Sequence, residues 1–287
     1  MYNSKKYTTF AAQKQTNNVC LCDKMSTNEW ISNRELHGQM TFSIGEMHHV
    51  FSDRSPKNMN TELARLVARD RIQSVYRGFY VIVPIQYRLK GIIPPSFYID
   101  ELMQHLGKPY YIGLLSAAAM YGAGHQRAMQ TQVVTTPPRL NVSNRNQLLD
   151  WNYRQNFPQE LLITKNAEMG VIHYSSPELT AVDLVQYAEH VGGYQRATTV
   201  LAELVDILDM TKVADVIPYT TIATIQRLGY LLEFVLEKKE KADALYLLLK
   251  ERKHWKSVLL NSSMPSKTAS TNRWHVIANI DIEIDEL

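Results

Sequence analysis

Polar and basic residues between positions 57 and 77 have types and spacing suited to contacting nucleic acid. Lysine and arginine can donate hydrogen bonds to phosphates or to guanine, and asparagine can pair with adenine. The candidate DNA-binding residues are Lys57, Asn58, Asn60, Thr61, Arg65, Arg69, Tyr76 and Arg77. Because base contacts come mainly from the first half of a recognition helix, Lys57, Asn58 and Thr61 are the main candidates for reading sequence.

A helix starting at Pro56 must present most of these side chains. Ser55 suits the N-cap, and Pro56 suits the first helical position, where a missing N–H costs nothing. Apolar residues then recur at helical spacing and predict one buried stripe on a helix running to about Asp70. This stripe consists of Met59, Leu63, Leu66 and Val67. A shorter apolar helix, carrying Ile44, Met47, His48 and Phe51, is expected before the break at residues 53–56.

The period changes from 3.6 to 2 after Arg71, which predicts a β-hairpin. Ile72, Ser74 and Tyr76 are expected on one face of the first strand, and Gln73 and Val75 on the other. Arg77-Gly78 supplies the turn, and residues 79–83 form the returning strand. At this tip Arg77 can reach a phosphate or a minor groove. Two helices followed by a hairpin are typical of a winged helix-turn-helix, although such a compact α/β unit can also bind proteins.

Charge favours the DNA-binding interpretation. Residues 41–90 contain eight cations and four anions, a net charge of +4, whereas the whole chain carries +3. The remainder is therefore close to neutral, at −1. A basic excess confined to one module is what binding to phosphates requires.

The composition describes an ordinary globular protein of one or two domains, with 287 residues and 45% hydrophobic residues. No apolar run approaches the length of a membrane span, so a cytoplasmic location is expected. Cys20 and Cys22 are the only cysteines and are expected to be free thiols. Residues 1–24 are expected to be a disordered leader, with Met25 as an alternative start.

The rest of the chain predicts a larger second domain. Glycine and prolines in residues 89–95 mark a connector between a DNA-binding domain at 25–90 and a C-terminal domain at 96–287. Short strands are expected around residues 132–135, 140–142, 161–164, 170–174 and 274–280. Helices are expected around residues 99–106, 113–122, 175–187, 220–228, 229–237 and 241–250, with another after Gly193. The expected fold class is α+β, an N-terminal winged helix followed by a mixed α/β domain.

Several motifs resemble the AbiEi antitoxin family, in order over about residues 26–285. They are YRGFY at 76–80, the run at 110–135, SSPELTAVDLVQY at 175–187, GGYQRATTVLAEL at 192–204 and QRLGYLLE at 226–233. The resemblance implies an antitoxin of a type IV toxin–antitoxin system, which aborts phage infection. It also implies a winged helix that binds inverted repeats in operator DNA and represses its own operon. The functional partner would be an AbiEii-type nucleotidyltransferase toxin.

Motifs for catalysis, metal or cofactor binding are lacking. The adjacent His48 and His49 point about 100° apart on a helix and cannot converge on one ion. Asp281, Glu283 and Asp285 would share a face of a strand but are more simply an acidic solvated segment. We therefore expect no enzyme and no cofactor. The alternative function is an interaction module that neutralises the nucleotidyltransferase toxin directly without binding DNA.

Overall fold

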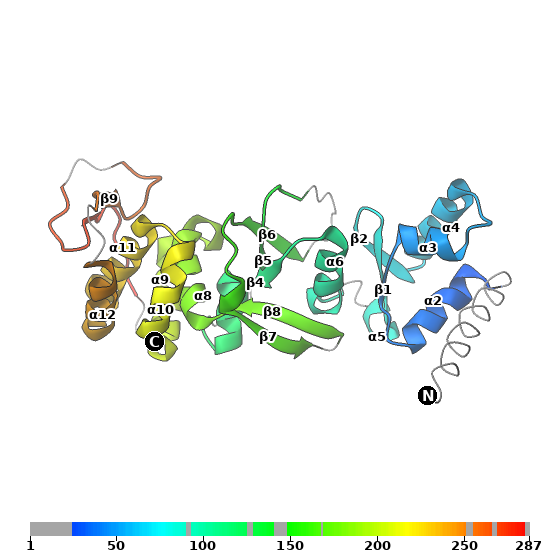
Figure 1. The fold of residues 1–287 in the computed structure, drawn as a ribbon, viewed down its shortest axis with the longest axis horizontal. Coiled ribbons are helices and arrows are strands. Elements are labelled where there is room, and N and C mark those ends of the chain that lie inside the picture. The colour runs from blue at the N-terminus through cyan, green and yellow to red at the C-terminus, as the bar shows by residue number, and fades with distance from the viewer. Residues whose placement is uncertain are drawn as a thin grey trace, which may run out of the picture. The chain divides into compact units, whose positions relative to one another are not determined.

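The computed structural model describes residues 25–89, 93–124, 129–140, 148–167, 169–250, 255–265 and 269–284. It confirms a mixed α+β chain with several sheets (Figure 1). The described residues form two compact units. The first extends to Gly107 and includes part of Ala167–Gly170, and the second holds most of the chain from Lys108 onwards.

The first unit consists of short helices and one three-stranded antiparallel sheet. The sheet order is β1-β3-β2, so the β2-β3 hairpin is joined by the earlier strand β1. The elements are α2 (Thr27–Leu36), β1 (Thr41–Ser43), α3 (Ile44–Val50), α4 (Pro56–Ala68), β2 (Ile72–Tyr76), β3 (Phe79–Ile82), α5 (Ile85–Arg88), a 3-10 turn (Pro95–Phe97) and α6 (Ile99–Leu106) (Figure 1).

Serine residues start the first three helices. Ser26 and Ser43 each form a capping box with the glutamate three residues later, which satisfies exposed N–H groups at the helix start. Ser55 accepts the N–H of Asn58 at 3.3 Å, and Pro56 occupies the first turn, confirming the predicted start of α4. These local signals fix where each helix begins.

The core of the first unit is aromatic at its centre. The ring of Trp30 meets Phe42 and Phe51 edge-on, with centroids 5.1 and 5.8 Å apart. Met47 and Leu63 are also buried in this cluster. The core therefore holds α2, α3 and α4 against the sheet.

Two details of this unit were predicted wrongly. Val67, expected in the buried stripe of α4, is 37% exposed. The strict alternation expected along β2 is broken by a register shift between Ser74 and Tyr76. Because a β-bulge places two residues opposite one, Val75 is buried as well as Ile72.

The second unit is built on a five-stranded sheet with the order β6-β5-β4-β8-β7. Strand β4 pairs antiparallel with β5 and parallel with β8, and β5 pairs parallel with β6. The strands are β4 (Tyr110–Ile112), β5 (Thr131–Thr135), β6 (Leu149–Tyr153), β7 (Leu162–Ala167) and β8 (Gly170–Ser175), with a separate parallel pair, β9 (Val258–Leu259) and β10 (Val276–Ile277).

Helices α8 to α12 gather at one end of this sheet (Figure 1). The helices are α7 (Leu114–Ala118), α8 (Pro177–Gln186), α9 (Tyr194–Leu204), α10 (Met210–Val216), α11 (Ile222–Tyr230), a π-helical turn (Leu231–Val235) and α12 (Lys239–Lys250). Shorter 3-10 turns are Ala119–Tyr121, Gln159–Leu161, Ala188–Val191, Val205–Ile207 and Ile217–Tyr219. Helix α8 is the centre of the core, because nearly all of its side chains are buried.

The second unit also differs from the sequence-based expectations. The helix expected over residues 113–122 is α7 followed by a 3-10 turn, and the strand expected at 274–280 is only the two-residue β10. Strand β6 and helix α10 were not predicted. Residues 141–142 of one expected strand lie outside the described residues, as does the expected leader at 1–24. Across the described ranges, no helix has the length and apolar character needed to cross a membrane.

Candidate functional site

Helix α4 separates its side chains into a buried and an exposed face. Met59, Leu63 and Leu66 are buried in the core of the first unit. The six candidate DNA-binding residues of this helix and its C-cap are all exposed. They are Lys57, Asn58, Asn60, Thr61, Arg65 and Arg69.

The polar groups of this face remain largely available to a ligand. The Thr61 hydroxyl donates to the carbonyl of Lys57 at 3.0 Å, which leaves its oxygen free to accept. Arg65 is 3.8 Å from Glu62, a long and exposed ion pair that holds the guanidinium weakly. Lys57 and Arg69 make no ion pair with any other described residue.

The β2-β3 hairpin presents a further cation. Arg77 is exposed at the turn and has no ion pair within the described ranges, while Tyr76 before it is half-buried. Gly78 has a φ of 73°, and its carbonyl accepts the N–H of Ile44 at 2.7 Å. The turn is therefore fixed to the first residue of α3.

Replacing Gly78 with alanine is expected to destabilise the first unit by about 1–2 kcal/mol, because a side chain disfavours positive φ. The new Cβ would also lie 3.1 Å from Cγ2 of Ile44. Gly38→Ala is a matched control, since Gly38 has a φ of 71° with nothing within 4 Å of the added Cβ. Urea denaturation should show a larger loss of unfolding free energy for Gly78→Ala than for Gly38→Ala. Equal losses would mean that the contact with Ile44 does not affect stability.

Other cations of the first unit serve its structure. Arg54 donates to Thr27 Oγ1 at 2.8 Å and lies over the Phe51 ring. Arg71 pairs with Glu35 at 2.7 Å. The local charge excess in the sequence is therefore only partly available to a ligand. Among the described residues, the available cations are on α4, its C-cap and the hairpin.

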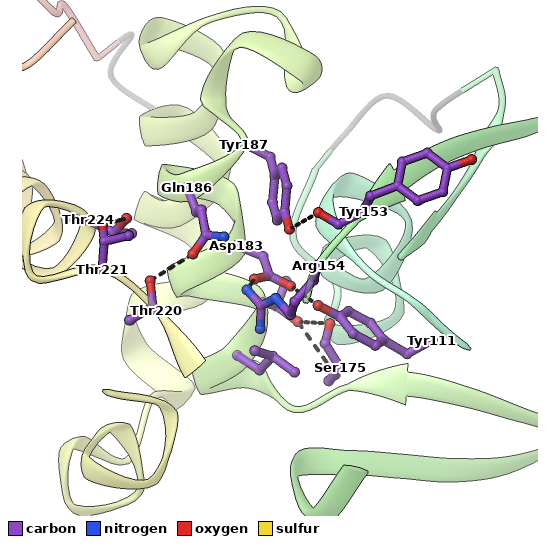
Figure 2. A network of polar contacts seen from close by, with 12 residues as sticks. Tyr111, Tyr153, Arg154, Ser175, Asp183, Gln186, Tyr187, Thr220, Thr221 and Thr224 are labelled. Carbon is purple, nitrogen blue, oxygen red and sulfur yellow. Dashed lines mark hydrogen bonds and ion pairs between the residues drawn. The ribbon is translucent and has the colours of Figure 1, made fainter. Parts of the chain in front are cut away.

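The second unit contains a buried polar network that was not predicted (Figure 2). Asp183 of α8 forms an ion pair with Arg154, which follows β6, and accepts a hydrogen bond from the Tyr111 hydroxyl of β4 at 2.7 Å. The Tyr187 hydroxyl donates to the carbonyl of Tyr153 at 3.1 Å. Burial and the neighbouring Asp183 charge raise the pKa of Tyr111, so this hydroxyl stays a neutral donor.

This network binds elements of the fold to one another. Asp183 is completely buried and Arg154 is 5% exposed, so neither faces solvent where a ligand could meet it. Together they connect β4, the end of β6 and α8. The signal in the sequence is a lone aspartate within the otherwise apolar stretch of α8, which requires a buried partner.

The histidines and carboxylates considered as metal ligands do not come together. Among the described residues no group of three histidine, cysteine, aspartate or glutamate side chains could hold a metal ion. Asp281 and Glu283 lie in a segment without regular secondary structure, and Asp285 lies outside the described residues.

A family model and a solved structure are similar to parts of this chain. Residues 111–234 match the family model described as the AbiEi antitoxin C-terminal domain. No curated protein matches the chain. The crystal structure of RV2827C protein from Mycobacterium tuberculosis is similar over 86% of this chain and 88% of that chain, with a TM-score of 0.61. At 13% sequence identity this likeness concerns the fold alone. This match to an AbiEi antitoxin C-terminal domain supports an antitoxin role in a toxin–antitoxin system.

Proposed function

We propose that the first unit is a winged helix-turn-helix that binds double-stranded operator DNA. Helix α4 is the recognition helix, and the β2-β3 hairpin is the wing. The observation that carries this proposal is the set of exposed cations at Lys57, Arg69 and Arg77, which have no ion pair among the described residues. Charges left without protein partners on a helix face and a hairpin tip suit phosphate contact.

DNA binding combined with an antitoxin domain makes the chain a repressor of its own operon. The operator is a pair of inverted repeats, and the toxin is an AbiEii-type nucleotidyltransferase. The system is of type IV, acts in the cytoplasm and defends the cell against phage by abortive infection. The second unit supplies antitoxicity, and the buried Asp183 network keeps its sheet and α8 in one rigid core.

The second candidate function is a non-DNA-binding module that neutralises the toxin directly. The exposed polar residues of α4 would then contact protein, as other compact α/β units do. The two functions differ in salt dependence. Phosphate contacts release counterions, so DNA affinity falls steeply with salt concentration.

Replacing Lys57 and Arg77 with alanine in the full chain is expected to weaken binding to the DNA upstream of its gene. The plot of log affinity against log salt concentration should become less steep, by about one unit of slope for each phosphate that the variant can no longer neutralise. Fluorescence anisotropy at several salt concentrations measures both quantities. The control is Lys239→Ala with Lys250→Ala, which removes two exposed charges from the second unit. Unchanged binding and slope in the Lys57/Arg77 variant would refute the assigned site.

A further inference from the structure

Two arginines flank the proposed recognition helix α4, one at each end. Arg54 lies in the turn before the helix, and Arg71 follows the C-cap residue by two positions. By charge alone, both belong to the cations of the first unit that could meet phosphate. In the structure both guanidinium groups instead contact α2 or the residue shortly before it.

The contacts of Arg54 are made at the start of α2. Its Nη1 donates to Thr27 Oγ1 at 2.8 Å, and its Nη2 donates to the carbonyl of Met25 at 3.0 Å. Its guanidinium carbon lies 4.1 Å from the centroid of the buried Phe51 ring, which covers one face of the group. Both terminal nitrogens of Arg54 are therefore used within the first unit.

Arg71 makes corresponding contacts near the end of α2. Its Nη1 forms an ion pair with Glu35 at 2.7 Å, and its Nη2 donates to Ser32 Oγ at 3.0 Å. The main chain of Arg71 is fixed as well, since its N–H donates to the carbonyl of Leu66 in α4 at 3.0 Å and its carbonyl accepts the N–H of Val83 at 3.0 Å. Arg71 therefore joins the end of α4 to α2 and to the residue after β3.

Attachment at both ends fixes the direction of α4 relative to α2. A helix of 13 residues is about 20 Å long, so contacts at one end alone would leave the other end free to swing. Apolar packing in the core is non-directional, whereas hydrogen bonds prefer narrow ranges of distance and angle. The direction of α4 decides which base edges its side chains reach, while phosphate contacts carry no sequence information.

We propose that Arg54 and Arg71 are positioning residues that set the sequence selectivity of α4 without touching DNA themselves. The exposed cations Lys57, Arg69 and Arg77 supply affinity for any duplex. The attachment of α4 to α2 supplies the discrimination between the operator and other DNA. This inference rests on the proposed DNA-binding function.

Substitutions in α2 test this division, because they break the arginine contacts without removing a cation. Glu35→Ala removes the ion-pair partner of Arg71, and Thr27→Val removes the hydroxyl that accepts from Arg54. We compare the affinity of the full chain for the DNA upstream of its gene with its affinity for a scrambled duplex of equal length. In each variant this ratio should fall about ten-fold, the discrimination that one base pair provides. Affinity for the scrambled duplex, measured by fluorescence anisotropy, should not fall.

Asp70→Asn is the matched control for Glu35→Ala. Asp70 is exposed directly before Arg71 and forms no ion pair with any other described residue, and asparagine tolerates its φ of 50°. The control also removes one negative charge, so it should raise the affinity for both duplexes and leave their ratio unchanged. The charge swap Glu35→Arg with Arg71→Glu rebuilds the ion pair and should restore most of the discrimination.

An unchanged affinity ratio in the folded Glu35→Ala and Thr27→Val variants would overturn the inference and leave the proposed function intact. A rise in affinity for both duplexes with Glu35→Ala, as in the control, would overturn it too, because Arg71 would then act as a phosphate-binding cation. Thr27→Val changes no charge and tests the same point independently. Equal binding of both duplexes by the unchanged chain would contradict operator recognition itself, and the inference with it.

Discussion

Asp183→Ala is expected to lower the free energy of unfolding of the second unit by about 3–5 kcal/mol. The substitution leaves the Arg154 guanidinium buried without its counter-charge and removes the acceptor of the Tyr111 hydroxyl. A buried charge without a partner keeps most of its desolvation cost. Urea denaturation followed by tryptophan fluorescence measures the loss.

Two further variants separate the destabilisation caused by the unpaired charge from that caused by the lost side-chain volume. Replacing both partners with apolar residues, Asp183→Leu with Arg154→Met, should destabilise less than Asp183→Ala because no buried charge remains. Tyr111→Phe should cost about 1.5–3 kcal/mol, the range for a hydrogen bond to a charged group. A loss below about 1 kcal/mol for Asp183→Ala would show that Arg154 reaches another partner or solvent, contrary to the network in Figure 2.

Gly229→Ala is expected to destabilise the same unit by about 1–3 kcal/mol through overpacking. A Cβ at this position would overlap three ring atoms of Trp274, which is completely buried. The indole is fixed by Glu233, so it cannot move aside without losing that hydrogen bond. Thermal unfolding measures the effect.

Gly45→Ala is the matched helical control, since its added Cβ would make only an ordinary contact, 3.6 Å from Ser43 Oγ. This change should be neutral or stabilising, because alanine has the higher helix propensity. Combining Gly229→Ala with Trp274→Leu should lower stability by less than the sum of the two single losses of stability, since the smaller leucine makes room for the added Cβ. Additive losses would contradict direct contact between the two positions.

The elements that the sequence predicted well are those set by local signals. The adjacent residues Ser55 and Pro56 define the start of α4, and Gly78 defines the hairpin turn. Apolar spacing placed Met59, Leu63 and Leu66 in the core. Each of these features depends on residues close together in the sequence.

The errors arise where distant strands decide the outcome. The bulge in β2 is set by its register with β3, and it brings Val75 inward without any local marker. Strand β6 has a mixed, largely polar sequence, and its position depends on pairing with β5. Pairing across the sheet therefore overrides the alternation expected of one strand alone.

The polar network could not be predicted from the sequence for the same reason, because its members are far apart along the chain. Tyr111 and Asp183 are 72 positions apart, and Arg154 and Asp183 are 29 apart. The sequence indicates that Asp183 needs a partner but does not say which one. For the candidate DNA-binding residues of α4 and its C-cap, by contrast, exposure followed from helical geometry alone. Their function remains a proposal.

The central claim is that DNA binding and antitoxicity belong to separate units of this chain. It is tested most directly by growth rescue of cells that express an AbiEii-type nucleotidyltransferase, the toxin proposed as the partner of this chain. The Lys57→Ala/Arg77→Ala chain, expressed from an independent promoter, should rescue growth fully while it no longer occupies the operator. Loss of rescue together with loss of operator binding, in a variant that remains folded, would contradict this division.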